Sequence, residues 1–195
     1  MSTLTRAIEI ATKSHEGARD KYGSPYINHV TRVMNMGQTD NEKIVGVLHD
    51  VIEDTPWTFE DLEKEGFSKE VIDAIKCVTK TSEDEDYAEF ITRVKINPLA
   101  VKVKLNDLTD NLDIKRMPVV LESDLKRLNK YLKAYNELIK SQKTNSNPRK
   151  GLMYSDVMSK IIQRLESMNL LSKDPPKPRP DIDNTISVTF IKRKK

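Results

Sequence analysis

The segment His49–Thr55, which reads HDVIEDT, decides the fold of this chain. Its first six residues include four side chains that can bind a metal ion or carry a proton: His49, Asp50, Glu53 and Asp54. Apolar residues before and inside the segment recur at helical spacing and Pro56 follows it, which predicts the end of an amphipathic α-helix. Side chains four residues apart stack one turn apart, so the polar groups are expected along one edge of a buried helix. The alternative is an exposed acidic helix end, because charged side chains are commonly solvated.

The same helical spacing predicts further helices on both sides of this segment. They are expected at residues 4–15, 28–37, 58–63, 68–78, 87–94, 97–116 and 122–140. Thr39 with Glu42 predicts a capping box for the helix that carries HDVIEDT, and Thr58 and Ser68 are predicted caps of the next two helices. Residues 101–105 alternate as in a strand, but the pattern around them is too long for a typical strand and favours a helix.

The length of 195 residues suits one domain with an appendage. We expect the domain at residues 1–140 and a C-terminal extension at 141–195. The extension reads as a polar linker, one amphipathic helix capped by Ser155, and a proline-rich basic tail with a short strand at Thr185–Ile191. Because one strand needs a partner, the extension is also where we expect any homo-oligomer contact.

The composition favours a cytoplasmic protein with no membrane partner. No apolar run approaches the roughly 20 residues that span a bilayer, and the N-terminus lacks a signal-peptide pattern. The single cysteine, Cys77, excludes an internal disulfide and lies in an apolar helical pattern, so it is expected in the core. Residues 172–195 hold seven Lys or Arg against three Asp, but without interleaved aromatic residues we do not expect a nucleic-acid partner.

The chain has three histidines, and two of them can meet carboxylates. His15 ends a predicted helix and is expected to be structural. The other two complete a candidate set of two imidazoles and two carboxylates: His29, His49, Asp50 and Asp107. This donor set suits a divalent transition ion such as Mn²⁺ better than a structural zinc, which favours thiolates. Two histidines limit the expected occupancy to one ion.

Several segments of the chain, in order, carry a resemblance to a known family. They are SHEGARDKYGSPYINH (14–29), VGVLHDVIEDT (45–55), GFSKEVIDAIKCVTK (66–80), VKLNDLTDN (103–111) and RLNKY (127–131). The string H…HDxxED…D within them resembles the HD-domain metal-dependent phosphohydrolases, and more closely the hydrolase domain of RelA/SpoT-type proteins and stand-alone small alarmone hydrolases. The resemblance covers roughly residues 1–140.

This resemblance implies an all-α helical bundle and a Mn²⁺-dependent 3′-pyrophosphohydrolase of guanosine tetra- or pentaphosphate (ppGpp), an enzyme of the stringent response. Carried over by position, it implies these metal ligands: His29, His49, Asp50 and Asp107. It makes Glu53 and Asp54 the pair that activates water and assists the leaving group. The implied substrate contacts are Lys21, Asn111, Arg127 and Tyr131. For Arg127 the alternative is a solvated helix face, and for Tyr131 a core aromatic.

One position departs from the pattern. Where the alarmone hydrolases carry an arginine that stacks on guanine, this chain has Asp20, which cannot stack as a guanidinium does. Lys21 follows it and supplies charge, and Arg19 precedes it. Two other functions therefore stay open: an HD phosphohydrolase of another nucleotide or phosphorylated cofactor, and a regulatory protein that senses a nucleotide without catalysis.

Overall fold

The structure is a computed structural model that describes residues 2–82 and 84–145, and its regular elements there are helical. The elements are α1 (Leu4–Ser14), α2 (Ile27–Met36), α3 (Asp40–Leu48), α4 (Val51–Asp54), α5 (Phe59–Lys64), α6 (Lys69–Val78), α7 (Tyr87–Val94), α8 (Pro98–Asn111), η1 (Ile114–Arg116) and α9 (Glu122–Asn145). The predicted all-α class is confirmed. The helix from Ser155 and the strand at Thr185–Ile191 lie outside the described residues. Within the described part, no helix has the length and apolar character needed to cross a bilayer.

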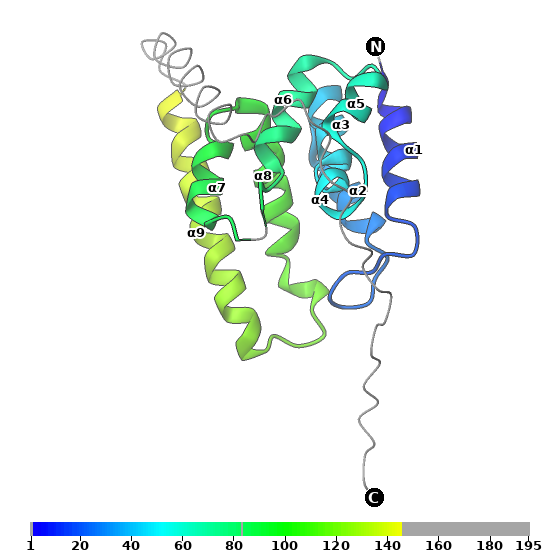
Figure 1. Ribbon diagram of the computed structural model, residues 1–195. Coiled ribbons are helices and arrows are strands. Elements are labelled where there is room, and N and C mark those ends of the chain that lie inside the picture. The colour runs from blue at the N-terminus through cyan, green and yellow to red at the C-terminus, as the bar shows by residue number, and fades with distance from the viewer. Residues whose placement is uncertain (1, 83, 146–195) are drawn as a thin grey trace, which may run out of the picture. The chain divides into compact units, whose positions relative to one another are not determined.

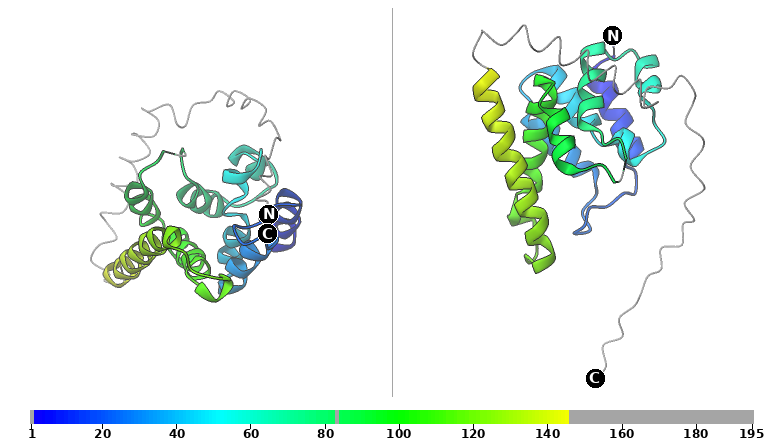
Figure 2. Two further views of the ribbon diagram at one scale, coloured as in Figure 1. Left: turned by 90° about the horizontal axis from the view of Figure 1, so that it is seen from below. Right: turned by 60° about the vertical axis from the view of Figure 1, so that its left-hand side comes forward.

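Helix α8 lies in the middle of the bundle and contacts α2, α3, α6, α7 and α9. Figure 1 shows α9 running alongside α8 on one side of the domain, with α1 on the opposite side. Seen from below in Figure 2, α9, α8, α2 and α1 follow one another across the domain. Because α8 is covered on several sides, apolar residues surround much of its circumference, which explains the strand-like alternation at residues 101–105.

Most predicted helix starts are confirmed by their caps. The hydroxyls of Thr58 and Ser68 accept hydrogen bonds from backbone N–H groups of the following first turns, and Thr58 forms a full capping box with Asp61. The box predicted at Thr39 is only half formed, since Thr39 accepts from the N–H of Glu42 but the carboxylate of Glu42 bonds elsewhere. It accepts from the N–H of Gln38 and from Lys102 Nζ.

The prediction of one continuous helix through HDVIEDT is wrong. Helix α3 ends at Leu48, and the short α4 begins at Val51. Between them the backbone of Asp50 stays in the right-handed region but departs from the regular helical angles, with φ −100° and ψ −4°. Its carboxylate accepts a hydrogen bond from the Tyr26 hydroxyl at 2.6 Å. The position of Asp50 is therefore set by a tertiary contact, and the polar side chains do not form the regular row along one helix that periodicity predicted.

The helix predicted at 97–116 also ends early. Helix α8 stops at Asn111, with Leu112 as its C-cap, and a separate 3₁₀ turn follows at Ile114–Arg116. The side chain of Asp113 accepts from the N–H of Lys115 and caps this turn. A short polar side chain that accepts a hydrogen bond from a nearby backbone N–H group favours the start of a new turn over the continuation of the preceding helix.

Gly46 allows α3 to approach the backbone of α2. A Cβ atom at this position would lie 3.1 Å from Met34 Cα and 3.2 Å from Met34 N. Rigid backbone cannot move aside cheaply, so Gly46→Ala is expected to destabilise the protein. The steric overlap is expected to destabilise the folded protein by about 1–3 kcal/mol, whereas the higher helix propensity of Ala stabilises it by about 1 kcal/mol. Urea denaturation should show a net loss of about 1 kcal/mol, whereas Asn129→Ala on the exposed face of α9 should not lower stability. A Gly46→Ala protein as stable as the wild type would contradict this packing.

Candidate metal centre and active site

Three parts of the bundle bring the predicted histidines and carboxylates together. His29 comes from α2, His49 and Asp50 from the break between α3 and α4, and Asp107 from α8. One donor atom from each of His29, His49 and Asp50 lies within 4.8 Å of the others. Asp107 Oδ1 lies 3.2 Å from His29 Nε2 and 3.7 Å from His49 Nε2. The side chain of His49 is 2% exposed and that of Asp50 18%, so an exposed helix end is wrong for this pair.

Hydrogen bonds fix which nitrogen of each ring faces the cluster. His49 Nδ1 donates to the carbonyl oxygen of Gly46 at 2.8 Å, and His29 Nδ1 donates to Asp110 Oδ2 at 2.6 Å. The Nδ1 atom of each ring therefore carries the proton, so that each ring in its neutral form presents the lone pair of Nε2 to the carboxylates. His49 Nε2 is buried, has no hydrogen-bond partner, and lies 3.0 Å from Asp50 Oδ2. Facing lone pairs on nitrogen and oxygen need a cation between them, so these residues fit a divalent ion.

The charges of the cluster point to the same conclusion. Burial lowers the pKa of both imidazoles, but their carboxylate neighbours outweigh it, so the pKa of His29 is raised and that of His49 is raised well above its usual value. Burial raises the pKa of both carboxyls, but the positive charges nearby outweigh it. His49 foremost holds the pKa of Asp50 low, and Lys104 foremost holds that of Asp107 low. The carboxylates thus favour positive charge at the centre of the cluster, carried either by protons on the imidazoles or by a cation that displaces these protons.

Further side chains contact the candidate ligands, and the sequence did not predict these contacts. Tyr26 donates to Asp50, and Lys104 Nζ donates to Asp107 Oδ2 at 2.6 Å. Asn111, expected at the substrate, donates to Asp107 Oδ1 at 2.6 Å. The available signal was position: Lys104 lies three residues before Asp107 and Asn111 four after it, so all three share one helix face.

The predicted acid pair occupies two different environments. Glu53 Oε1 lies 3.4 Å from Lys80 Nζ, and Glu53 Oε2 accepts from the backbone N–H of Lys80 at 3.3 Å. Asp54 lies at the exposed end of α4. Partial burial, followed by the charges of Asp50 and Glu53, raises the pKa of Asp54 to about 6. One carboxylate is thus held by a cation, while the other can exchange a proton near neutral pH.

The raised pKa of Asp54 predicts a pH-dependent gain for Asp54→Asn. In the folded state the group binds its proton up to about pH 6, so its favourable contribution is complete below the unfolded value of 3.8 and is lost as pH rises through 6. The variant should therefore be more stable than the wild type at pH 7, by less than about 1 kcal/mol because solvent screens the exposed charge, and equal at pH 4. Urea unfolding with a chelator present measures this, with Asp73→Asn on α6 as control. A gain of equal size at both pH values would refute the assignment.

Two predicted substrate contacts share one carboxylate. Lys21 Nζ donates to Asp124 Oδ1 at 2.5 Å, and Arg127 Nη2 lies 3.4 Å from the same oxygen. Arg127 also donates to the Tyr22 hydroxyl at 2.7 Å, while its Nε is buried and has no hydrogen-bond partner. Asp124 is 1% exposed and lies in the first turn of α9, so it ties the loop after α1 to this helix. Arg127 is thus half-buried and paired, and the solvated helix face considered for it is wrong.

Positive side chains gather around Tyr131, which is half-buried and packs against the core. Arg127 and Lys130 lie over its ring, 5.9 Å and 5.4 Å from the centroid. Burial lowers the pKa of Lys130, and the charges of Lys80, Lys104 and Arg127 lower it further. Such mutual repulsion is relieved by a bound anion, which suits the phosphate groups of a nucleotide.

Asp20 has a structural role in the loop after α1. Its Oδ1 accepts from the N–H groups of Tyr22 and Ser24, at 2.9 Å and 3.0 Å. Its Oδ2 pairs with Arg116 Nη2 at 3.1 Å. Arg19, considered as a substitute at the base, donates to the carbonyl of Gly23 at 2.6 Å.

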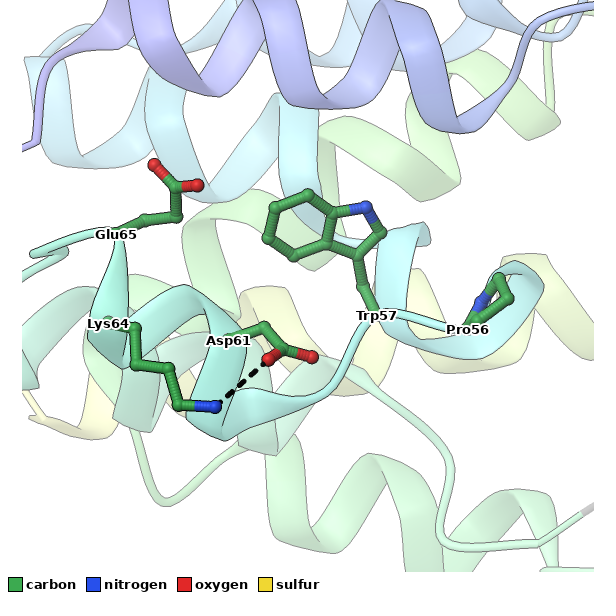
Figure 3. A pocket seen from close by; sticks show the side chains of 5 residues that line it. All are labelled: Pro56, Trp57, Asp61, Lys64 and Glu65. Atoms are coloured by element: carbon green, nitrogen blue, oxygen red, sulfur yellow. Dashed lines mark hydrogen bonds and ion pairs between the residues drawn. The ribbon is translucent and has the colours of Figure 1, made fainter. Parts of the chain in front are cut away.

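One surface pocket lies away from the cluster, beside α5, and has a volume of about 480 Å³. Figure 3 shows the residues that line it: Pro56, Trp57, Asp61, Lys64 and Glu65. Lys64 pairs with Asp61, and Glu65 makes a bidentate pair with Arg6. The charges of this pocket are therefore already balanced by one another, and none of the predicted site residues lines it.

The chain is similar to known proteins in sequence and, for one solved structure, in fold. It is 30% identical over 138 residues to the guanosine-3′,5′-bis(diphosphate) 3′-pyrophosphohydrolase of Aquifex aeolicus, an alignment that covers 65% of this chain and 19% of that protein. It is 31% identical over 123 residues to the bifunctional (p)ppGpp synthase/hydrolase SpoT of Escherichia coli, covering 56% and 17%. A solved structure of a metazoan ortholog of SpoT that hydrolyzes ppGpp superposes with a TM-score of 0.55 at 25% identity, over 71% of this chain and 84% of that one. No protein-family model matches the chain.

The described residues form an all-α domain built around a cluster of two histidines and two aspartates. In sequence and in fold the chain is similar to SpoT-type guanosine-3′,5′-bis(diphosphate) 3′-pyrophosphohydrolases. It spans less than a fifth of the length of the two curated relatives described above.

Proposed function

We propose that this chain is a metal-dependent phosphohydrolase that removes the 3′-pyrophosphate of guanosine tetra- or pentaphosphate, with one Mn²⁺ ion. The observation that carries the proposal is the convergence of two imidazole Nε2 atoms, of which that of His49 is buried without a hydrogen-bond partner, on two carboxylates. The names of the relatives support the substrate, and the donor set of two nitrogens and two oxygens suits Mn²⁺.

The proposed metal ligands are the four converging side chains: His29, His49, Asp50 and Asp107. When bound, the ion lowers the pKa of a coordinated water and neutralises phosphate charge. Asp54, whose pKa of about 6 lies near neutrality, takes the proton that the attacking water gives up. Glu53, held beside Lys80, orients that water. The water oxygen forms a bond to the phosphorus, and the bond between this phosphorus and the 3′-oxygen breaks. Asp54 then gives its proton to the leaving 3′-oxygen.

The proposed substrate contacts supply positive charge on the α9 side of the cluster. Lys21 and Arg127 contact Asp124 in this structure. When substrate binds, each gives up part of this contact and binds phosphate oxygens of the substrate. The unpartnered Nε of Arg127 is a free donor for one of them. Asn111 donates a hydrogen bond to Asp107 and contacts the ribose of the substrate. The ring of Tyr131 packs against the guanidinium group of Arg127.

The proposal is tested by incubating the purified protein with Mn²⁺ and ppGpp and separating the products by anion-exchange chromatography. Equal amounts of guanosine diphosphate and pyrophosphate are expected, and a chelator should stop their release. Intact ppGpp after prolonged incubation of a protein that retains its metal would refute the assigned substrate.

A second candidate is hydrolysis of a different nucleotide or phosphorylated cofactor at the same site. It is favoured by Asp20, which is bonded to its own loop and to Arg116 and so offers no cation to a guanine base. A panel of nucleotides assayed in parallel separates the two candidates by which one is turned over. Binding without turnover of any member would instead support the nucleotide-sensing alternative.

A further inference from the structure

A buried carboxylate outside the proposed ligand set contacts one of its histidines. Asp110 lies on α8 three residues after Asp107, and its side chain is 4% exposed. It accepts from His29 Nδ1 at 2.6 Å. Two guanidinium groups share the same carboxylate: Arg32 Nε at 2.5 Å from Oδ1, and Arg116 Nη1 on Oδ2. Nothing in the sequence pattern HDxxED…D points to this residue.

We propose that Asp110 is a positioning residue that holds His29 as a metal ligand. A neutral imidazole has one N–H group, and Asp110 takes it at Nδ1, which leaves the lone pair at Nε2. That nitrogen lies 3.2 Å from Asp107 Oδ1 and 3.6 Å from Asp50 Oδ2, on the side where the ion is expected. The carboxylate thus selects the tautomer and fixes the ring plane.

The two arginines fix the carboxylate in turn. Arg32 projects from α2, the helix of His29, and binds both oxygens of Asp110, the second at 3.2 Å. Arg116 also donates to the Asp110 carbonyl oxygen at 2.9 Å and reaches Asp20 at 3.1 Å. Through these two arginines, Asp110 is linked to α2, to the 3₁₀ turn, and to the loop that carries Lys21.

His49 provides an internal contrast. Its Nδ1 donates to the backbone carbonyl of Gly46, which no side-chain substitution at another position removes. Only His29 depends on a replaceable side chain for its orientation. A substitution of Asp110 is therefore expected to disturb one of the four ligands. It should lower the affinity for the ion without abolishing the site.

The inference rests on the proposed metal site, so its test measures metal binding directly. In a competition titration with a fluorescent chelator, Asp110→Asn and Asp110→Ala are expected to raise the Kd for Mn²⁺ about 10- to 100-fold. Glu42→Gln is the matched control, because Glu42 is also buried and paired with a cation, Lys102, away from the cluster. The control should keep the wild-type Kd even where it loses thermal stability.

The outcomes separate the two claims. A wild-type protein that binds no divalent ion would overturn the metal site itself. A wild type that binds Mn²⁺, with folded Asp110 variants of unchanged Kd, would overturn the role of Asp110 alone. Long-range ¹H–¹⁵N spectra of the wild type with diamagnetic Zn²⁺ give a second readout that needs no variant. The proton of His29 is expected on Nδ1, and a proton on Nε2 would contradict the proposal.

Discussion

Asp50→Asn is expected to lower kcat for nucleotide hydrolysis by at least about 10³-fold. Asp50 Oδ2 lies 3.0 Å from His49 Nε2 and 3.6 Å from His29 Nε2, so it faces the Nε2 atoms of both histidines. The amide has the same shape but no charge. A bound ion contributes several kcal/mol to the stabilisation of the transition state, and about 1.4 kcal/mol corresponds to a tenfold rate.

The loss should appear in both metal content and rate. Bound Mn²⁺ is measured after gel filtration, and steady-state kinetics are measured at saturating Mn²⁺. Asp73→Asn is the control, since Asp73 pairs with Lys69 on the exposed side of α6 and should keep full activity. An Asp50→Asn enzyme with more than a tenth of the wild-type kcat would show that the charge of Asp50 is not needed for the reaction.

Replacing Asp54 is expected to separate proton transfer from metal binding. Asp54→Asn should lower kcat by about 10²–10⁴-fold, the range of general acid–base catalysis, while the Kd for Mn²⁺ stays within about twofold of the wild type. The reason is placement: Asp54 lies at the exposed end of α4 and influences Asp50 through charge, without a direct contact. Glu53→Gln should have a smaller effect, because an amide oxygen can still accept from the N–H of Lys80.

The pattern across the two variants is the diagnostic part. Both should retain one bound ion per chain, and only Asp54→Asn should flatten the pH dependence of kcat/KM near pH 6. An Asp54→Asn protein that loses its ion would place Asp54 among the metal ligands. Full activity in Asp54→Asn would move the proton-transfer role to another group.

Local periodicity predicted the helices because each buries one apolar face, and the bounds of α5, α6 and α7 follow their caps closely. It failed at Asp50, where the hydroxyl of Tyr26, distant in sequence, holds the carboxylate and the helix is interrupted. Periodicity describes contacts within an element and carries no information about such a partner. The early end of α8 has a local cause, because the side chain of Asp113 caps the 3₁₀ turn that follows.

The composition of the candidate site was predictable, but its supporting contacts were not. Histidines and aspartates are rare enough in this pattern to be recognised from the sequence alone. Asp110 looked like any polar helix residue, because its contact with His29 exists only when α2 packs on α8. The role of Asp124 was likewise not predictable, because its partner Lys21 is distant in sequence and contacts it only in the folded chain.

The central claim is that one divalent ion binds between α2, the α3–α4 break and α8. Anomalous diffraction from crystals grown with Mn²⁺ tests it most directly. One peak is expected, about 2.0–2.3 Å from donor atoms of four side chains: His29, His49, Asp50 and Asp107. No peak in this cluster, or a peak bound by other residues, in crystals of a protein that hydrolyses its nucleotide would contradict the account.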